Sequence, residues 1–466
     1  MSGQKPTRKA LGAWYTPPEL VEVVVKGVLD DFGRIWRGGS RPVRVIDPAC
    51  GDGRLLDAVR VGLHLLGHQV DGVGCDVDAE ALARIDHPSI SVVHADALSR
   101  EWGADRFDIV IGNPPFLSQM ATGTSRGGSS RHGGGPYANA AAEFLSLAVR
   151  LADPDGSAIG LVLPQSVLAA RDVGPVRAEI DRSATRTWSW WQQDQRGLFD
   201  AAVNVCALGF TRPGHGEPDS FGWTQVVTAR LGVPDLRIAR FDVDGRIADR
   251  ADLNANFRDE YYALVDAVSD DADGPPLVTS GLIDPGRSLW GTRTVKFAKR
   301  NHDHPRVDLS KLDGRFPAWA ARKLVPKVLV ANQTRVVEAV ADVEGAWLPG
   351  VPVVSVTPLV DDPDPGATVR RIEAVLTSPV ASLWCWHLGA GTGMSATSVR
   401  LTPEVLGDVP WPVGDLDDAV TALAQGDVLG CGSAVMEAFG VADDGDLFNW
   451  WRAALPDRVE RIGRVR

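Results

Sequence analysis

The stretch FDIVIGNPPF occupies residues 107–116. Its first half predicts a short buried strand, and Pro114 and Pro115 then fix the chain direction and remove two backbone donors. The side-chain carbonyl of Asn113 and the backbone carbonyl of Pro114 can therefore both face a cavity as hydrogen-bond acceptors. Phe116 adds an aromatic face, against which a stacked base gains about 1–3 kcal/mol. The stretch indicates a pocket for a flat heterocycle that carries an amino group, although a proline-stiffened strand exit is the simpler interpretation.

The motif DPACGDG at 47–53 stands between an apolar strand at 43–46 and an apolar helix at 55–66. A strand, a turn that contains glycine and a helix form the first unit of a nucleotide-binding α/β domain. Gly51 and Gly53 would let a ligand approach the backbone closely. The third glycine of the dinucleotide-binding pattern is missing, which disfavours a hydride-transfer enzyme.

Acidic residues follow the next two predicted strands. Residues 70–75 lead to Asp76, whose place at a strand tip suits a ribose diol, and residues 90–93 lead to Asp96. Open parallel sheets bind their ligands at the carboxyl ends of the strands. We therefore expect these acids and Asn113 to line one edge of a parallel sheet.

The segment Thr16-Pro17-Pro18-Glu19 predicts the start of a helix. Thr16 is the expected N-cap, with Pro17 in the first turn and Glu19 as its partner in a capping box. The amino end of such a helix can also receive a carboxylate.

In their order along the chain, these motifs resemble those of class I S-adenosylmethionine-dependent methyltransferases, specifically the gamma-class adenine-N6 DNA methyltransferases of the Taq type. The resemblance implies an α/β fold with a Rossmann-like methyltransferase sheet, followed by a C-terminal mixed α+β DNA-recognition domain. Five motifs in the same order are more specific than any one of them. The matching stretches are YTP at 15–17, DPACGDG at 47–53, GCDVD at 74–78, HADAL at 94–98 and NPPF at 113–116.

The resemblance also implies S-adenosylmethionine as the cofactor. Thr16 would lie near its methionine carboxylate, Asp76 on its ribose and Asp96 on its adenine. The implied cofactor-binding residues are Thr16, Asp47, Pro48, Ala49, Cys50, Gly51, Gly53, Asp76, Asp96 and Asn113.

The implied catalytic residues are Asn113, Pro114, Pro115 and Phe116, and the target base would stack between Phe116 and Phe199. Phe116 stands where the family more often has Tyr, so stacking survives and a role for a hydroxyl does not. The amino nitrogen of adenine is a poor nucleophile because its lone pair is delocalised into the ring. Two acceptors, at Asn113 and Pro114, would pull that nitrogen toward tetrahedral geometry without a metal. The base must leave the duplex to reach them.

Composition narrows the alternatives. The chain has 466 residues, is 44% hydrophobic and 23% charged, and is long enough for two or three domains. Its five cysteines are scattered without a Cys-x-x-Cys pair, so we expect neither a zinc site nor a disulfide framework. Residues 1–9 lack the apolar core of a signal peptide, and no run of about 18 apolar residues suggests a membrane span. The expected location is the cytoplasm.

A basic stretch at 293–335 contrasts with the net charge of −12 of the whole chain. It contains eleven Lys or Arg and three Asp, a balance of +8, and five of the eight lysines in the chain. Such clustering is what binding to double-stranded DNA requires, and a solvated basic face without function is the alternative. The predicted DNA contacts are Arg293, Lys296, Lys299, Arg300, Lys323, Lys327 and Arg335.

Clusters of Pro, Gly and Asp at 212–218 and 269–276 suggest domain boundaries. The expected organisation is a cofactor-binding catalytic domain at 1–212, a connector at 213–275 and a target-recognition domain at 276–466. Within the last, alternating residues predict a β-meander with strands at 327–330, 335–340 and 351–356. A short helix followed by proline is expected at 402–410, and short helices at 415–466.

Two further segments carry weaker expectations. The loop at 121–135, rich in Gly and Ser, is equally consistent with a substrate-gated flap and with an inert loop. Trp188, Trp190 and Trp191 are expected to be packing residues, because tryptophan normally buries a large area.

Other functions are weaker or stay open. Cytosine-C5 methylation needs a nucleophilic thiol, and no cysteine stands in a Pro-Cys pocket. Cytosine-N4 methylation uses the same amino-group chemistry, although such enzymes usually have Ser in place of Asn113. RNA and protein amino-group methyltransferases share the NPPF signature but generally lack a large C-terminal domain. A non-catalytic DNA-binding subunit of a defence complex would keep the fold without turnover, and a restriction or defence-system protein is the partner considered besides double-stranded DNA.

Overall fold

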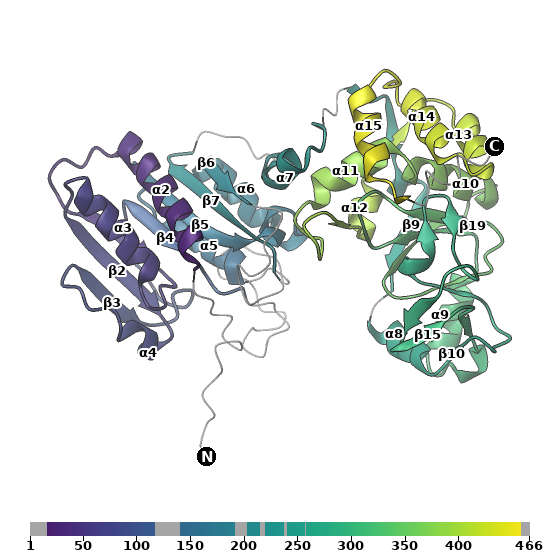
Figure 1. Ribbon diagram of the computed structural model, residues 1–466, viewed down its shortest axis with the longest axis horizontal. Coiled ribbons are helices and arrows are strands. Elements are labelled where there is room, and N and C mark those ends of the chain that lie inside the picture. The colour runs from purple at the N-terminus through teal and green to yellow at the C-terminus, as the bar shows by residue number, and fades with distance from the viewer. Residues whose placement is uncertain are drawn as a thin grey trace, which may run out of the picture. The chain divides into compact units, whose positions relative to one another are not determined.

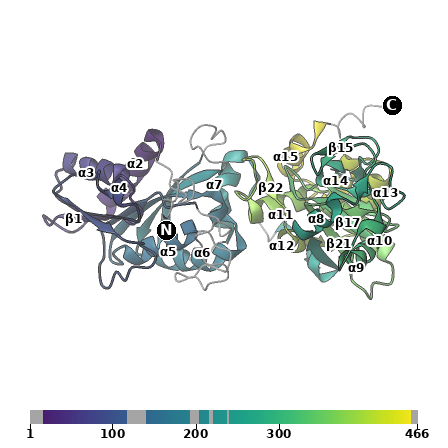
Figure 2. The ribbon, with the colours of Figure 1, turned by 90° about the horizontal axis from the view of Figure 1, so that it is seen from below.

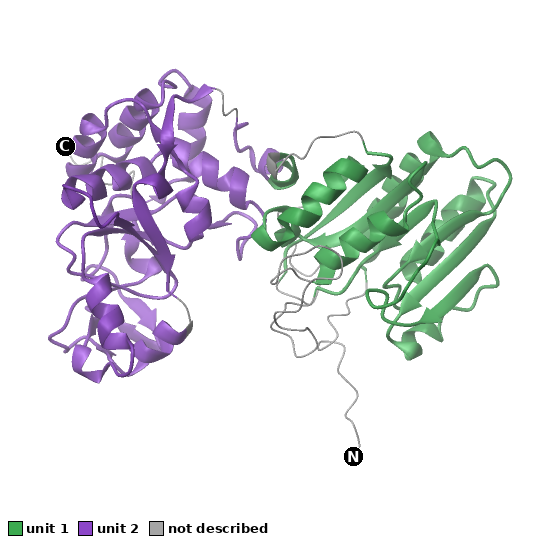
Figure 3. Ribbon diagram, turned by 180° about the vertical axis from the view of Figure 1, so that it is seen from behind, with its two compact units in different colours: residues 1–227 green, residues 228–466 purple. Residues whose placement is uncertain are grey.

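The computed structural model describes residues 16–116, 140–191, 203–214, 220–236, 240–256 and 258–457. The chain divides into two compact units, Met1–Val227 and Thr228–Arg466 (Figure 3). Strand β9 (Ala251–Ala255) lies inside the stretch that we expected to be a connector, and it pairs with β21 (Val353–Pro358) of the C-terminal unit. The unit boundary therefore lies between the two breaks in composition, and the functional division into catalytic and recognition domains stays a prediction.

The N-terminal unit is built on a seven-stranded sheet of order β3-β2-β1-β4-β5-β7-β6 (Figure 1). Its first five strands in that order are parallel, while β7 is antiparallel to both β5 and β6. This topology confirms the expected Rossmann-like sheet. The strands are β1 (Val43–Asp47), β2 (Val70–Asp76), β3 (Ile90–His94), β4 (Ile109–Gly112), β5 (Ser157–Pro164), β6 (Thr185–Trp190) and β7 (Val205–Arg212).

Helices cover both faces of this sheet (Figure 2). Helices α2 (Pro18–Ile35) and α3 (Arg54–Leu65) pack together over one face, and α5 (Ala140–Leu151) and α6 (Gly174–Ser183) over the other. A single turn of helix, α4 (Ala79–Leu82), follows β2. Because residues four apart share a helix face, α2 buries one stripe, consisting of Leu20, Val24, Val28 and Phe32.

Trp188 packs between α2 and the sheet, in space left by two glycines. A Cβ atom added at Gly27 would lie 2.3 Å from the indole of Trp188, and one added at Gly209 would lie 2.0 Å from it. Trp190 contacts the same hydrophobic core, and Trp191 is buried. The three tryptophans are packing residues, as expected from the large area that tryptophan normally buries.

The C-terminal unit contains a four-stranded antiparallel sheet of order β19-β17-β21-β9. Strand β17 (Lys327–Ala331) is buried at all five positions and is paired on both sides, with β19 (Ala339–Asp342) and with β21. The predicted meander would have placed β19 in the centre. The order differs because the apolar segment of β17 is best buried between two neighbours.

Helices accompany this sheet in the C-terminal unit, and they confirm the mixed α+β class and the short helices expected at the C-terminal end (Figure 1). Thr402 caps the helix expected near 402–410 by accepting a hydrogen bond from the Val405 amide, 3.3 Å long. The helices are α10 (Pro365–Leu376), α11 (Pro379–Gly389), α12 (Pro403–Gly407), α13 (Asp417–Ala424), α14 (Val428–Ala438) and α15 (Gly445–Ala454).

A second hydrophobic cluster of the C-terminal unit joins α8 (Arg258–Val265), β10 (Val268–Ser269), the hairpin of β14 (Val295–Phe297) with β15 (Arg300–His302), and α9 (Phe316–Lys323). These elements lie together in one lobe in Figure 1.

Short pairings complete the unit. They are β8 (Val243–Arg246) with β23 (Pro410–Pro412), β10 with β16 (Arg306–Val307), β11 (Leu277–Val278) with β20 (Leu348–Pro349), β12 (Ile283–Asp284) with β13 (Arg287–Ser288), and β18 (Gln333–Thr334) with β22 (Val399–Arg400).

Among the helices described, none combines the length and the apolar character needed to cross a membrane.

Candidate active site

Strand β1 delivers a buried carboxylate to the edge of the sheet. Asp47, its last residue, is 2% exposed and accepts a hydrogen bond of 3.0 Å from the Ala49 amide through Oδ1. Gly51 and Gly53 follow with φ of 52° and 78°. An L-residue is strained in this left-handed region, and a Cβ at Gly53 would also lie 2.8 Å from Ile85. At Gly51 nothing lies within 4 Å of a Cβ position, so the loop backbone is open to a ligand.

Asp76, the last residue of β2, holds this loop in place. Its Oδ2 accepts a 2.7 Å hydrogen bond from the Gly51 amide, and its Oδ1 accepts a 2.9 Å bond from the Asp78 amide. The Cys50 amide donates to the Cys75 carbonyl, 3.0 Å away. A carboxylate offers about four lone-pair sites, so Asp76 keeps acceptor capacity for ligand hydroxyls.

Asp96 lies two residues after the end of β3 and begins the turn that follows. Its Oδ1 accepts from the Leu98 amide at 3.1 Å and its Oδ2 from the Ser99 hydroxyl at 2.7 Å. The residue is exposed. The two hydrogen bonds fix the orientation of the carboxylate. Because the residue is exposed, solvent or a ligand can still reach it.

The edge of the sheet is therefore anionic. Within the residues that the structure describes, Asp47, Asp76 and Asp96 form no ion pair. Burial raises the pKa of Asp47 to about 8; the hydrogen bond from Ala49 opposes this shift and the nearby charge of Asp76 adds to it. Such a buried carboxyl group is suited to a cationic ligand, which would favour its ionised form.

Thr16 and Asn113 meet at this edge. The Asn113 side chain donates from Nδ2 to Oγ1 of Thr16 at 3.0 Å, and Thr16 is 8% exposed. The expected N-cap role of Thr16 is wrong, because α2 begins at Pro18 and its N-cap position is Pro17. A residue before proline is excluded from the helical region, so Pro18 keeps Pro17 extended and leaves the Thr16 hydroxyl to Asn113.

The rest of the NPPF turn is partly enclosed. Pro114 is buried, while Pro115 and Phe116 are half-buried, and Phe116 contacts the core cluster beneath α2 and α3. A Cβ at Gly112 would lie 3.3 Å from Oδ1 of Asp47, which places that carboxylate against the base of the turn. Phe199 and the loop at 121–135 lie outside the described residues.

The structure thus brings together Thr16, Asp47 and Asn113, which come from three separate segments. The contact between Thr16 and Asn113 was not foreseen, since the sequence carries no indication that two residues 97 positions apart share a hydrogen bond. The narrow space between β1 and β4 at Gly112 was also missed, although a glycine at the end of a buried strand is a usual mark of close approach.

In the C-terminal unit, the basic stretch is divided between surface and core. Arg293, Lys296, Lys299, Arg300 and Arg335 are exposed. Two other predicted DNA contacts are not available to a phosphate, and the prediction is corrected for both.

Lys327 is fully buried in β17, and its ammonium is paired with Asp342. Lys323 is 9% exposed and donates to Oδ1 of Asn254 at 3.1 Å. A cation that is enclosed by protein and already bonded cannot reach a nucleic-acid backbone. Both lysines are therefore structural.

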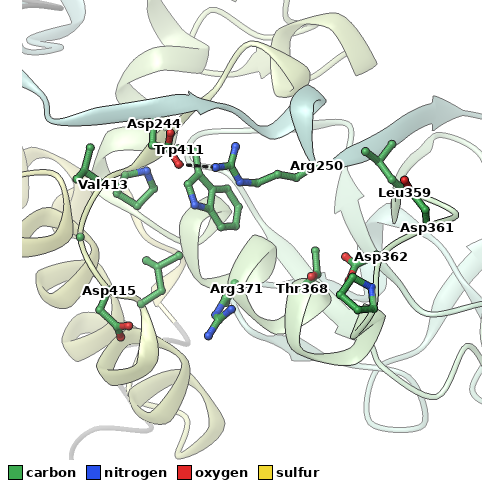
Figure 4. A pocket seen from close by; sticks show the side chains of 14 residues that line it. Asp244, Arg250, Leu359, Asp361, Asp362, Thr368, Arg371, Trp411, Val413 and Asp415 are labelled. Atoms are coloured by element: carbon green, nitrogen blue, oxygen red, sulfur yellow. Dashed lines mark hydrogen bonds and ion pairs between the residues drawn. The ribbon is translucent and has the colours of Figure 1, made fainter.

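The C-terminal unit also has an open pocket of about 750 Å³ (Figure 4). Arg250 lies over the Trp411 ring, 4.6 Å from its centroid, and forms a 2.8 Å ion pair with Asp244. The other acidic residues that line the pocket are Asp361, Asp362 and Asp415. With four carboxylates against the guanidinium groups of Arg250 and Arg371, the charge of this surface disfavours phosphate.

Comparison with known proteins supports an assignment for part of the chain. Residues 4–180 match the family described as N-6 DNA Methylase. The type II methyltransferase M.BanIII of Aneurinibacillus aneurinilyticus is 26% identical over 140 residues, 26% of this chain and 24% of that protein. The type II methyltransferase M.TthHB8I of Thermus thermophilus is 37% identical over 108 residues, 23% of this chain and 22% of that protein.

The chain thus spans about a quarter of the length of the curated relatives it matches. Among solved structures, the type I restriction-modification methyltransferase subunit from Streptococcus thermophilus aligns with a TM-score of 0.34 at 17% identity, over 43% of this chain and 45% of that one. The similarity to the N-6 DNA Methylase family therefore extends over residues 4–180, within the N-terminal unit.

Proposed function

We propose that the protein transfers a methyl group from S-adenosylmethionine to the exocyclic N6 of an adenine rotated out of double-stranded DNA. The observation that carries this proposal is the placement of the Asn113 amide, which is held by Thr16 at the end of β4 beside the buried carboxyl group of Asp47. The match of residues 4–180 to the family described as N-6 DNA Methylase supports it.

The residues at the sheet edge fit this cofactor in charge and shape. When bound, S-adenosylmethionine supplies an electrophilic methyl group on a cationic sulfonium sulfur. Asp47 and Asp76 offer carboxylates to a ligand with an ammonium and ribose hydroxyls, and Asp76 has lone pairs left for the latter. Gly51 offers open backbone beside them, and Asp96 an accessible carboxylate for the adenine ring.

Asn113 and Pro114 act on the target base. Because Nδ2 of Asn113 donates to Thr16, the amide oxygen points away from Thr16 and serves as the acceptor for an amino N–H. The Pro114 carbonyl accepts the second N–H, and together the two acceptors draw the nitrogen lone pair out of conjugation. Phe116 stacks on the base, which offsets part of the few kcal/mol that extrusion from the duplex costs, because stacking returns about 1–3 kcal/mol.

Thiol chemistry is not needed for this reaction. All five cysteines are buried, and burial raises the pKa of each, to about 11 for Cys75 and about 12 for Cys206. A covalent mechanism of the cytosine-C5 kind requires a thiolate, which these surroundings disfavour.

Double-stranded DNA is the proposed substrate, bound through the exposed basic residues of the C-terminal unit. We further propose that the enzyme works in the cytoplasm as part of a restriction-modification or defence system, with a restriction or defence protein as its partner. Both curated relatives named above are type II methyltransferases, and this supports the assignment.

The test compares genomic DNA from cells that express the unsubstituted protein or Asn113→Ala, sequenced by a method that reports modified adenines and cytosines. Methylated adenine in a defined motif, absent in Asn113→Ala and retained in Asn449→Ala, is expected. Asn449 is the matched control, because it is an exposed residue of α15 in the C-terminal unit. Methylated cytosine would move the assignment to cytosine-N4, and no modified base would overturn the proposal.

A further inference from the structure

The hairpin of β14 and β15 ends in an unusually tight turn. Ala298 and Lys299 are its two central residues, with φ of 48° and 67°. Two-residue hairpins of this kind need positive φ at both positions and normally use Asn-Gly or Asp-Gly. Among the non-glycine residues described, these two alone have positive φ. Backbone strain of this sort concentrates at functional sites, and here it gives the hairpin a narrow tip.

The register of the hairpin separates its two faces. Val295 pairs with His302 and Phe297 with Arg300, while Lys296 pairs with Asn301 between them. Phe297 and His302 are 4% and 7% exposed, so the first two pairs define the inner face. Side chains alternate across a strand, and Lys296 and Asn301 accordingly stand side by side on the outer face, both exposed.

The base of the hairpin is firmly held. Asp270 accepts hydrogen bonds of 3.2 Å from the amides of Asp303 and His304, and its Oδ1 lies 3.3 Å from Nδ1 of His302. Phe297 packs into the cluster that contains Leu264 of α8 and Trp319 of α9. The outer face is therefore presented on a rigid element, which is what precise recognition requires.

The polar side chains at the tip have no partner among the residues that the structure describes. In the part of the chain that the structure describes, the side chains of Lys296, Lys299, Arg300 and Asn301 form no hydrogen bond and no ion pair. Other cations of the same stretch are engaged: Arg306 with the Gly274 carbonyl, Lys311 with Asp308, and Arg315 with Asp259. Three adjacent positive charges without counter-charges repel one another and favour an anionic partner.

We infer that this hairpin enters the major groove of the DNA, with Lys296 and Asn301 contacting base edges and Lys299 and Arg300 contacting phosphates. The inference rests on the proposed function and assigns its sequence-specificity element. A basic surface alone would contact phosphates, whereas Asn301, an uncharged residue on the outer face, is assigned a contact with a base edge.

The dimensions and the chemistry agree with this placement. A major groove about 12 Å wide admits a two-stranded ribbon. The three paired residues of each strand extend roughly 10 Å at about 3.4 Å per residue, which compares with a groove depth of about 8.5 Å. Asn can bond an adenine through N6 and N7, and Lys a guanine through O6 and N7. The major groove of duplex RNA is too narrow for such an element.

The first arm of the test reads the methylation motif. Asn301→Ala, Lys296→Ala and the control Asn449→Ala are expressed in cells, and methylated positions are mapped on genomic DNA. We expect each hairpin substitution to relax one position of the motif, with discrimination against the wrong base falling by roughly 10- to 100-fold. Asn449→Ala should leave the motif unchanged.

The second arm measures binding to duplex DNA that carries the motif at several salt concentrations. Lys299→Ala should weaken binding to all sequences alike and lower the slope of log affinity against log salt by about 1. Lys26→Ala is its control, because Lys26 is an exposed lysine of α2 in an ion pair with Asp30, 2.6 Å long. Duplex RNA of the same length should not respond to either substitution.

The outcomes separate the two proposals. An unchanged motif in Asn301→Ala and Lys296→Ala, with uniformly weaker binding, would leave the hairpin as a phosphate contact and overturn base reading. Unchanged motif and unchanged binding in all three variants would remove the hairpin from the interface, while methylation by the unsubstituted protein upheld the enzyme assignment. If the unsubstituted protein methylated no DNA, both proposals would fail. Because the substituted side chains of the hairpin are exposed and form no hydrogen bond or ion pair with the described residues, thermal unfolding of the three hairpin variants should match that of the unsubstituted protein.

Discussion

Nδ2 of Asn113 donates a hydrogen bond of 3.0 Å to Oγ1 of Thr16, joining the end of β4 to a residue two positions before the start of α2. The bond fixes which end of the amide faces Thr16. An amide held through its nitrogen has its oxygen turned to the other side, and an oxygen is what an amino-bearing base needs as a partner. Thr16 is therefore a positioning residue for Asn113, whatever else it contacts.

Replacement of Thr16 by Val should lower the rate of methyl transfer by about tenfold. The valine keeps the shape but removes the acceptor, and a hydrogen bond lost at a buried site costs about 1–3 kcal/mol, where about 1.4 kcal/mol is a factor of ten. Thr16→Ser keeps the hydroxyl and should recover most of the rate. Single-turnover kinetics with saturating S-adenosylmethionine test this. A Thr16→Val protein with the unsubstituted rate would show that the bond does not position the amide.

Binding of the cationic cofactor should release a proton from Asp47 at neutral pH. Burial raises the pKa of this carboxyl to about 8 in the ligand-free protein, so it is mostly protonated at pH 7, and a bound cation favours the ionised form. Affinity should rise with pH and level off above about 8. Calorimetric titrations at pH 7 in two buffers of different ionisation enthalpy measure the released proton directly. Equal apparent enthalpies in both buffers would contradict this linkage.

The same group makes the ligand-free protein less stable as pH rises. The folded-state pKa of about 8 lies above 3.8, the ordinary pKa of an aspartate side chain, so the folded state binds more protons than the unfolded state between these pH values. The stabilisation is complete below about 4 and is lost as pH rises through 8. Asp47→Asn should remove this loss and raise the free energy of unfolding near pH 8 by an amount on the order of a few kcal/mol, while abolishing the proton release. Denaturant unfolding of the unsubstituted protein and of Asp47→Asn, each at pH 5 and pH 8, gives the free energies of unfolding that test this.

Much of the N-terminal sheet could be predicted because its information is local. Helix α3 spans Arg54–Leu65, within one residue of the bounds expected at 55–66, since an apolar period of 3.6 over three turns is hard to mistake. The acids at the strand ends follow from the general rule for parallel sheets. The prediction that Thr16 is the N-cap was wrong because two local rules conflict here. The restriction that Pro18 places on the backbone of Pro17 outweighed the preference for threonine as a cap.

The basic stretch shows what local reasoning misses. A count of Lys and Arg cannot distinguish an exposed cation from one with a buried partner, and Lys327 finds Asp342 only through the pairing of β17 with β19. The order of the four strands likewise depends on which strand can be buried on both sides. Such facts are properties of the assembled unit and are absent from any short window of sequence.

Two glycine substitutions should have opposite effects on stability. A Cβ at Gly209 in β7 would lie 2.0 Å from the indole of Trp188, so Gly209→Ala forces a packed ring to move and should cost about 1–3 kcal/mol. At Gly33 in α2 nothing lies within 4 Å of a Cβ, and Gly33→Ala should add up to about 1 kcal/mol through helix propensity. Unfolding in guanidinium chloride, followed by tryptophan fluorescence, measures both. Equal changes for the two would argue against the close packing of Trp188.

Lys327→Met should destabilise the C-terminal unit without changing how DNA binding depends on salt. The substitution leaves the carboxylate of Asp342 buried without its cation, although Asp342 still accepts from the amides of Ala346 and Trp347 at 2.9 Å each. Removing one partner of a buried pair costs about 3–5 kcal/mol, which a denaturation midpoint would reveal. Because Lys327 has no exposed side-chain area, the slope of log affinity against log salt should match that of the unsubstituted protein at a temperature where the variant is folded. A slope lower by about 1 in a fully stable Lys327→Met protein would place this lysine back in the DNA interface, so the two measurements together decide between a core and a surface role.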